Sequence, residues 1–168
     1  IEAFHQFRYA LGIDPNHVKL RTNYGIACLL VGDFENGWPD YEWRLQIEDL
    51  QLPAPYQLWN GEPLENKIIL VTAEQGVGDQ VMFASCILDL INLNPKQIIL
   101  ECDLRLAPLL ARSFPQVDIQ DRKDRKDVDW LREIGDIDFQ IAIGSLPGFF
   151  RQQLSDFPAS RSFLVSNA

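Results

Sequence analysis

Two hydrophobic periods divide the chain. In residues 1–49, apolar residues recur at intervals of three and four, as one face of an α-helix requires. From residue 67 onward, short runs rich in β-branched residues alternate with helical stretches, a pattern typical of βαβ units and a parallel sheet. Prolines and the turn cluster Asn60–Pro63 interrupt both periods over residues 50–66. The pattern therefore predicts a helical region over 1–49, a linker over 50–66 and an α/β domain over 67–168.

The helical region repeats itself after 34 residues. This shift superposes Ala3 on Gly37, Phe4 on Trp38, Phe7 on Tyr41, Leu11 on Leu45 and Ile13 on Ile47. Residues 18–31 lie between the two copies and predict a further helix, and the small residues of the first pair allow a neighbouring helix to approach closely. Such a period indicates stacked helical repeats, and a helical hairpin with no repeat ancestry is the alternative.

The α/β region predicts strands joined by helices. The strands are Ile68–Thr72, Gln97–Cys102, Val117–Ile119 and Phe139–Ile143, and the helices are Gln80–Leu93, Leu104–Phe114 and Gly148–Leu154. The first strand is apolar almost throughout, as a strand buried on both faces would be. Residues 121–138 carry dense charge of both signs and predict a solvated loop with a short helix around Trp130 and Leu131. The predicted fold class is α/β, with a Rossmann-like parallel sheet preceded by helices.

Trp59 lies among the turn residues of the predicted linker. We expect its ring to fill the seam between the two regions, because burying an indole removes a large apolar area from water. Stacking against a sugar is the alternative role for this residue.

The segment Ala73–Asp79 joins the first predicted strand to the first predicted helix. It therefore lies at the carboxyl edge of the sheet, where ligands of open α/β folds bind. Gly76 and Gly78, on either side of Val77, allow a ligand to approach the backbone closely. Backbone N–H groups at the start of the following helix favour an anion or a developing negative charge.

Three polar residues of this segment are the candidates for its chemistry. Asp79 can act as a general base toward a hydroxyl, or it can be the N-cap of the helix, where the helix dipole stabilises its charged form. Glu74 and Gln75 stand at the end of the strand, where side chains face the cleft. Glu74 can equally pair with a neighbouring loop. The predicted site therefore comprises residues 74–79.

Two nucleotide-binding motifs are incomplete in this segment. A dinucleotide fingerprint requires a third glycine where this chain has Val81, although Glu101 could supply the acid that binds a ribose. A phosphate-binding P-loop requires Gly-Lys followed by Ser or Thr, which is absent here. An oxidoreductase that binds a dinucleotide at Gly76–Asp79 remains a lesser alternative, and we expect no cofactor.

Composition narrows the classes of partner and of metal site. A net charge of -9 would repel a phosphate backbone, so nucleic acid is not expected as a partner. The cysteines at positions 28, 86 and 102 are odd in number and lie in apolar stretches, which predicts buried thiols in a reducing cytoplasm. The two histidines, at positions 5 and 17, are too few for a His-based metal site. We expect no metal, and any chemistry must use carboxylates.

No membrane span is predicted. The longest apolar run, residues 26–31, is far shorter than the roughly 20 apolar residues that cross a bilayer, and so is the run at residues 98–100. The chain opens on Ile1, its one methionine is Met82, and no signal-peptide pattern is present at its start. We therefore expect a stretch of a longer, cytoplasmic protein.

Several motifs occur in a recognisable order. They are Asp33–Trp38 with Tyr41–Arg44, then Trp59–Glu62, then Ile69–Asp79, and finally Ser145–Pro147. In this order the chain resembles bacterial tetratricopeptide-repeat (TPR) proteins with a glycosyltransferase-like C-terminal region. That region is similar to heptosyltransferases and, more distantly, to O-GlcNAc transferases. The resemblance covers nearly the whole chain and implies the GT-B architecture, in which two Rossmann-like halves enclose a cleft.

The resemblance implies a reaction and a division of labour. A sugar would pass from a nucleotide-sugar donor to an acceptor hydroxyl, with the first half shaping the acceptor side and the second half holding most of the donor. Asp79 matches a Gly-Asp position that such enzymes place at the acceptor. The chain would hold the end of a TPR array and the first half alone, so we expect it to be inactive by itself.

A second class of function remains open from the sequence. In this reading the chain is a non-catalytic interaction module, whose TPR groove binds a peptide or protein and whose Rossmann-like part is a degenerate scaffold. Further repeats are expected before Ile1, because a solenoid of this kind generally requires at least about three units.

Overall fold

The structure is a computed structural model that describes residues 2–47, 55–74, 76–122, 129–158 and 162–167. It divides into two compact units. The helical unit comprises Ile1–Leu50 and Pro147–Pro158, and the α/β unit comprises Gln51–Leu146 and Ala159–Ala168. This division differs from the predicted boundaries, which assigned residues 147–158 to the α/β domain.

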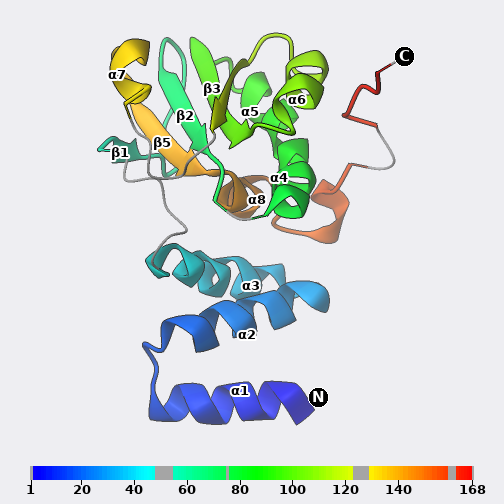
Figure 1. The fold of residues 1–168 in the computed structure, drawn as a ribbon. Coiled ribbons are helices and arrows are strands. Elements are labelled where there is room, and N and C mark those ends of the chain that lie inside the picture. Colours follow the sequence, from blue (N-terminus) through cyan, green and yellow to red (C-terminus); the bar gives the residue numbers. More distant parts are fainter. Residues whose placement is uncertain (1, 48–54, 75, 123–128, 159–161, 168) are drawn as a thin grey trace. The chain divides into compact units, whose positions relative to one another are not determined.

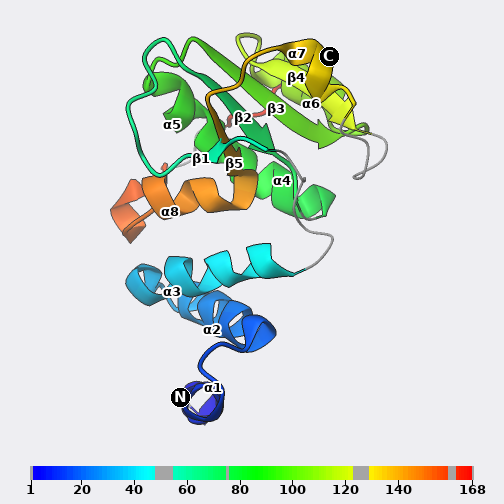
Figure 2. The ribbon, with the colours of Figure 1, turned by 90° about the vertical axis from the view of Figure 1, so that its left-hand side faces the viewer.

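The helical unit begins with three helices in sequence. They are α1 (Glu2–Ile13), α2 (Val18–Leu30) and α3 (Phe34–Tyr41), and a 3-10 turn, η1 (Glu42–Gln46), continues from α3. Helix α2 lies between α1 and α3 (Figures 1 and 2). The side chains of His17 and Asp33 accept hydrogen bonds from the first turns of α2 and α3, which fixes where these helices begin.

Two glycines bring α2 and α3 together. A Cβ atom added at Gly25 would lie 2.4 Å from the backbone nitrogen of Tyr41, and one added at Gly37 would lie 2.5 Å from a methyl carbon of Leu29. No larger residue fits either position without a shift of its neighbours. The expectation that a small residue at position 37 permits close approach is therefore confirmed.

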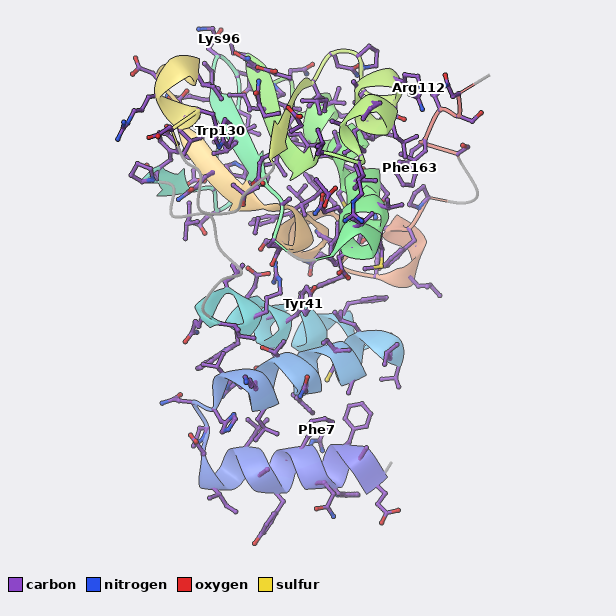
Figure 3. All side chains as sticks on the ribbon, in the orientation of Figure 1. Phe7, Tyr41, Lys96, Arg112, Trp130 and Phe163 are labelled. Carbon is purple, nitrogen blue, oxygen red and sulfur yellow. The ribbon has the colours of Figure 1, made fainter. Side chains whose placement is uncertain are left out.

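Aromatic rings join α1 to α2. The rings of Phe4 and Phe7 lie 5.9 and 5.8 Å from the ring of Tyr24 in α2. Figure 3 shows Phe7 on the side of α1 that faces α2. No described residue of α1 is fully buried, so these ring contacts account for much of its attachment.

The segment Pro147–Pro158 completes the helical unit. It contains most of α8 (Leu146–Phe150) and a 3-10 turn, η4 (Leu154–Asp156). The indole N–H of Trp38 donates a 2.7 Å hydrogen bond to the carbonyl of Arg151, and the ring of Phe157 lies 5.3 Å from that of Phe34. The segment therefore packs against α3 through Phe34 and through Trp38, which the 34-residue shift superposes on Phe4 of α1.

The α/β unit contains a parallel sheet with strand order β1-β5-β2-β3-β4 (Figure 1). The strands are β1 (Gln57–Leu58), β2 (Ile68–Thr72), β3 (Gln97–Asp103), β4 (Asp118–Arg122) and β5 (Phe139–Ala142). Every pair of neighbouring strands is parallel, which confirms the predicted parallel sheet.

Helices cover both faces of the sheet. They are α4 (Val77–Phe83), the 3-10 turn η2 (Ala84–Cys86), α5 (Ile87–Asn92), α6 (Ala107–Ser113) and α7 (Leu131–Ile134). Leu70 and Ile99 contact α7 on one face, and the alternate strand residues, which point to the other face, are also buried. Helices α5 and α7 lie on opposite sides of the central strands (Figures 1 and 2).

The observed elements match most of those predicted. Four strands lie within a few residues of their predicted bounds, whereas β1 lies in the segment predicted as a linker. The predicted helix 80–93 begins earlier, at Val77, and the predicted helix 148–154 is replaced by the shorter α8. In the charged stretch 121–138, α7 forms beside Trp130 as expected, while residues 123–128 lie outside the described part.

Two further observations concern the described residues. No helix among them is long and apolar enough to cross a membrane. The three cysteines are all buried and carry free thiols, as predicted. Burial raises the pKa of the Cys102 thiol to about 12, so this residue stays protonated and unreactive near neutral pH.

Candidate functional site at the carboxyl edge of the sheet

The strand order places a reversal between β2 and β5. From β2 the chain runs through α4 and α5 to β3, then through α6 to β4, moving toward one edge of the sheet. It then returns to form β5 on the other side of β2. Counted from β2, this is the order 3-2-1-4 of a Rossmann half, in which ligands bind outside the carboxyl ends of the strands at the reversal. The loops after β2 and β5 therefore form the candidate site.

The loop after β2 turns directly into α4. Gly76 is the N-cap residue of α4, and Gly78 lies in its first turn. Both glycines are exposed, and Val77 is half-buried. The bend therefore opens to the surface at the carboxyl edge, which the predicted site requires. Gln75, the remaining member of the predicted site besides the two acids, lies outside the described residues.

Asp79 is not the N-cap that the sequence suggested. Helix α4 begins at Val77, so Asp79 is its third residue. The Oδ2 atom of Asp79 accepts a 3.1 Å hydrogen bond from the backbone N–H of Gly76. The carboxylate thus stabilises the helix start from within the first turn, by accepting from a backbone donor that no helical carbonyl reaches. Its side chain is half-buried, at the exposed bend.

Glu74 links the two loops of the reversal. Its side chain is only 1% exposed, and its Oε1 atom accepts a 2.9 Å hydrogen bond from the backbone N–H of Gly144. Gly144 belongs to the 3-10 turn η3 (Ile143–Ser145), which follows β5. The contact with a neighbouring loop that the sequence left open is therefore present. Glu74 faces the protein, whereas the exposed bend carries Asp79.

Two more buried polar side chains extend this arrangement toward β3. The Oε2 atom of Glu101, which is 1% exposed in β3, accepts a 3.1 Å hydrogen bond from the backbone N–H of Ala73. The Oε1 atom of Gln80, in α4, accepts a 2.9 Å bond from the N–H of Asp103. Side chains thus bind the ends of β2, β3 and β5 to one another at a single edge.

The sequence indicated the exposed loop and not its supports. The sequence makes Glu101 a candidate ribose-binding acid, whereas in the structure its carboxylate is buried and accepts from a backbone N–H. From the sequence, Gln80 is only the first residue of a predicted helix. The signal that was available is a polar residue at or just beyond the end of an apolar strand, as in the sequence Ile98–Asp103. Such a residue lies at the edge where α/β folds hold ligands.

The electrostatics of the bend disfavour a phosphate group. A pyrophosphate bound in a dinucleotide fold accepts from the N–H groups at a helix start, where the dipole favours negative charge. Here the Asp79 carboxylate already lies at that start and takes the Gly76 N–H. A second anion would be repelled by it. The bend therefore suits an uncharged hydroxyl group better than a dinucleotide, for which the third glycine is also missing.

Trp59 is held within the α/β unit. Its indole N–H donates to the carbonyl of Glu62 at 2.8 Å, and its backbone N–H donates to the carbonyl of Gln140 in β5. The ring is 4% exposed. A ring buried to this degree offers no face for a sugar to stack on, so the alternative role considered for Trp59 is not supported.

Among the residues that the structure describes, no group of three or more His, Cys, Asp or Glu side chains is placed to hold a metal ion. The carboxylates at the carboxyl edge instead accept from backbone N–H groups.

Comparison with known proteins gives one informative similarity. The chain is 30% identical over 148 residues to Protein FlbA of Caulobacter vibrioides, an alignment that covers 81% of this chain and 25% of that protein. The chain thus spans about a quarter of the length of that relative. No protein-family profile matches the chain, and no solved structure matches it.

Proposed function

We propose that the protein carrying this chain is a glycosyltransferase of the GT-B architecture, and that this chain supplies the acceptor side. The observation that carries the proposal is the exposed bend Gly76–Asp79 at the reversal between β2 and β5. The order and parallel direction of the strands are those of a Rossmann half, and the bend presents a carboxylate where an acceptor would enter. The motif order that resembles TPR-linked glycosyltransferases supports the same assignment.

The proposed reaction uses the Asp79 carboxylate as a base. The acceptor oxygen forms a bond to the anomeric carbon of the donor sugar, while the bond from that carbon to the nucleotide phosphate oxygen breaks. The hydroxyl proton passes to Asp79, and the nucleotide leaves with the bonding electron pair. Because Oδ2 already accepts from Gly76, the proton would go to Oδ1 of the same carboxylate.

The helical unit supports the TPR part of the proposal. Residues related by the 34-residue shift play matching parts, since Phe4 of α1 contacts α2 and Trp38 of α3 contacts the segment Pro147–Pro158. That segment would then occupy the place of the next repeat's leading helix. Solenoids require a terminal unit that covers the last helix, and residues 147–158 would serve as that cap.

A donor screen tests the proposal. We expect the full protein to bind and turn over one class among UDP-, GDP-, ADP- and CMP-linked sugars, measured by thermal shift and by release of the nucleotide. This chain alone is expected to show no turnover, because the resemblance places most donor contacts in a second half. Turnover by the isolated chain, or no binding of any nucleotide sugar by the full protein, would contradict the proposal.

Replacement of Asp79 separates its two roles. Asn at this position keeps an oxygen that can accept from Gly76 and loses the basicity, so Asp79→Asn should lower kcat by about 10²- to 10⁴-fold. The free energy of unfolding should change by less than about 1 kcal/mol. Asp136→Asn, an exposed change in the same unit, is the matched control. Unchanged turnover in Asp79→Asn would leave this residue as a helix-capping group only.

The rival function is a non-catalytic interaction module. The closely packed α2 and α3 hairpin is the observation that favours it, because such hairpins form peptide-binding arrays. The two functions differ in what must follow this stretch in the full protein. A transferase requires a second βαβ set with basic residues that neutralise a nucleotide diphosphate, and its absence would favour the interaction module.

A further inference from the structure

Buried carboxylates at the carboxyl edge need an explanation beyond the fold. Removing a carboxylate from water costs several kcal/mol, which only good hydrogen bonds can offset. Glu74 and Glu101 are each 1% exposed, and each accepts from a backbone N–H of a loop that follows a neighbouring strand. Apart from Thr72 and Glu101, the buried residues of β2, β3 and β5 are apolar. These two acids therefore hold loops in place by hydrogen bonds, and do not fill apolar core volume.

The hydrogen bonds form a relay across the reversal. Glu101, in β3, holds the N–H of Ala73 in the loop after β2. The next residue, Glu74, holds the N–H of Gly144 in the turn after β5. The relay therefore fixes the loop that leads to Gly76–Asp79 from one side and the turn after β5 from the other. The two backbone groups held in this way, the N–H of Ala73 after β2 and the N–H of Gly144 after β5, lie on either side of the reversal.

We propose that Glu74 is a positioning residue, which sets the distance between the loop carrying Asp79 and the turn Ile143–Ser145 through its bond to Gly144. This inference rests on the proposed function of the same edge. Glu74 acts through the backbone and does not contact the reacting atoms. A misplacement of about 1 Å at a reacting centre costs on the order of 10²-fold in rate, so a single loop tie has a measurable effect.

Gln80 indicates what a conservative replacement at position 74 would do. Its amide oxygen accepts from the backbone N–H of Asp103 at 2.9 Å, at the same edge of the sheet. An amide oxygen is therefore able to hold a loop in this setting. Glu74→Gln retains the reach and an acceptor oxygen, whereas Glu74→Ala removes both. We therefore expect both the protection of the Gly144 amide from exchange and the turnover rate to be highest in wild type, lower in Glu74→Gln and lowest in Glu74→Ala.

The first arm of the test measures the tie itself in the full protein. Hydrogen–deuterium exchange at the Gly144 amide should be at least about tenfold faster in Glu74→Ala than in wild type, and close to wild type in Glu74→Gln. Glu101→Ala should accelerate exchange at Ala73 and leave Gly144 protected. The exposed Glu65→Ala is the control and should change neither amide. Equal exchange at Gly144 in Glu74→Ala and Glu65→Ala would overturn the proposal.

The second arm uses the nucleotide sugar that the full protein turns over, with water as the acceptor. Glu74→Ala should lower kcat about 100-fold, with kcat calculated from the concentration of protein that still binds the donor. The KM for the donor should stay within about twofold of the wild-type value. Glu74→Gln should lie within about tenfold of wild type. Wild-type kcat in Glu74→Ala would overturn the positioning role. If the wild-type protein turns over no nucleotide sugar, the proposed function fails. Hydrogen–deuterium exchange alone then decides whether Glu74 holds the Gly144 amide.

Discussion

The helical and α/β units differ in what they bury. In the α/β unit the central strands β2 and β3 present continuous apolar runs, and Leu70, Ile99 and Leu100 are fully buried. In the helical unit the described buried positions are largely small or polar residues: Thr22, Gly25, Cys28, Gly37, Asp40, Tyr41, Arg44, Pro147 and Arg151. The α/β unit is stabilised by a packed apolar core. The helical unit is stabilised by close approach of helix backbones, ring contacts and hydrogen bonds.

This difference predicts opposite vulnerabilities. A unit held by filled volume is damaged when a side chain is removed, because a cavity remains and dispersion contacts are lost. A unit held by close approach is damaged when a side chain is added, because the helices must separate. Substitutions of each kind therefore show whether the two units depend on different forces.

The largest effect is expected from a deletion in the α/β core. Leu70→Ala removes a fully buried side chain that contacts Ile99 and α7, and should lower the free energy of unfolding by about 2–5 kcal/mol. Leu58→Ala, at an exposed position of β1, is the matched control and should have little effect. Amide exchange should accelerate in β2 and β3. Equal losses in the two variants would mean that the strand core is not what stabilises this unit.

An added methyl group should break the helical unit. Gly25→Ala places a Cβ atom within 2.8 Å of three backbone atoms of α3, so α2 and α3 must separate, at an expected cost of about 1–3 kcal/mol. Gly12→Ala, at an open position of α1, is the same change without a clash and should stabilise by roughly 0.5–1 kcal/mol. Urea unfolding of both variants measures the difference. The same sign of change in both would contradict the close crossing of the helices.

A smaller loss should follow when the cap segment is loosened. Trp38→Phe keeps an aromatic ring on α3 and removes the indole N–H that donates to the carbonyl of Arg151. We expect a loss of about 1 kcal/mol, with faster amide exchange confined to residues 147–158. Trp43→Phe, in the same unit, serves as the control for loss of an indole. If exchange in 147–158 stays at the wild-type rate, this hydrogen bond does not hold the segment.

The comparison also explains which parts of the fold could be predicted from sequence. The central strands were predictable because each is an apolar run bounded by turn residues, and burial on both faces requires such a run. Strand β1 carries no such signal, since its two residues, Gln57 and Leu58, are exposed and are held by backbone pairing with β5. The assignment of residues 147–158 to the helical unit depends on Trp38, 113 residues away from Arg151, which no local pattern encodes.

The candidate site divides in the same way. The bend was predictable because Gly76 and Gly78 mark a strand-to-helix turn, and Asp79 stands beside them. The roles of Glu74 and Glu101 were not predictable, because each depends on which strand lies next to which. The pairing of β2 with β3 and β5 brings Ala73 and Gly144 within reach of these carboxylates. Strand order belongs to the tertiary structure and cannot be predicted from the hydrophobic periodicity alone.

The smallest expected effect concerns the amino edge of the same sheet, where an ion pair takes the place of the buried ties. The Lys67 ammonium donates to Asp138 at 2.8 Å, the backbone N–H of Ile68 donates to the other carboxylate oxygen, and these bonds lower the pKa of Asp138. A carboxyl group whose pKa is lower in the folded protein stabilises the fold above its unfolded pKa of about 4, and this stabilisation is lost as the pH falls through the folded pKa.

Asp138→Asn should therefore have a slightly lower thermal midpoint than wild type at pH 7, and a similar difference at pH 5. The difference should shrink below about pH 4 and vanish once Asp138 is protonated, because the neutral acid and the amide then carry the same charge. Thermal unfolding of both proteins between pH 7 and pH 2 provides the measurement. If the difference in thermal midpoint persists unchanged to the lowest pH, the substitution acts through packing and not through the charge of Asp138. The amino edge would then be stabilised like the buried core, by packing, and not by an ion pair.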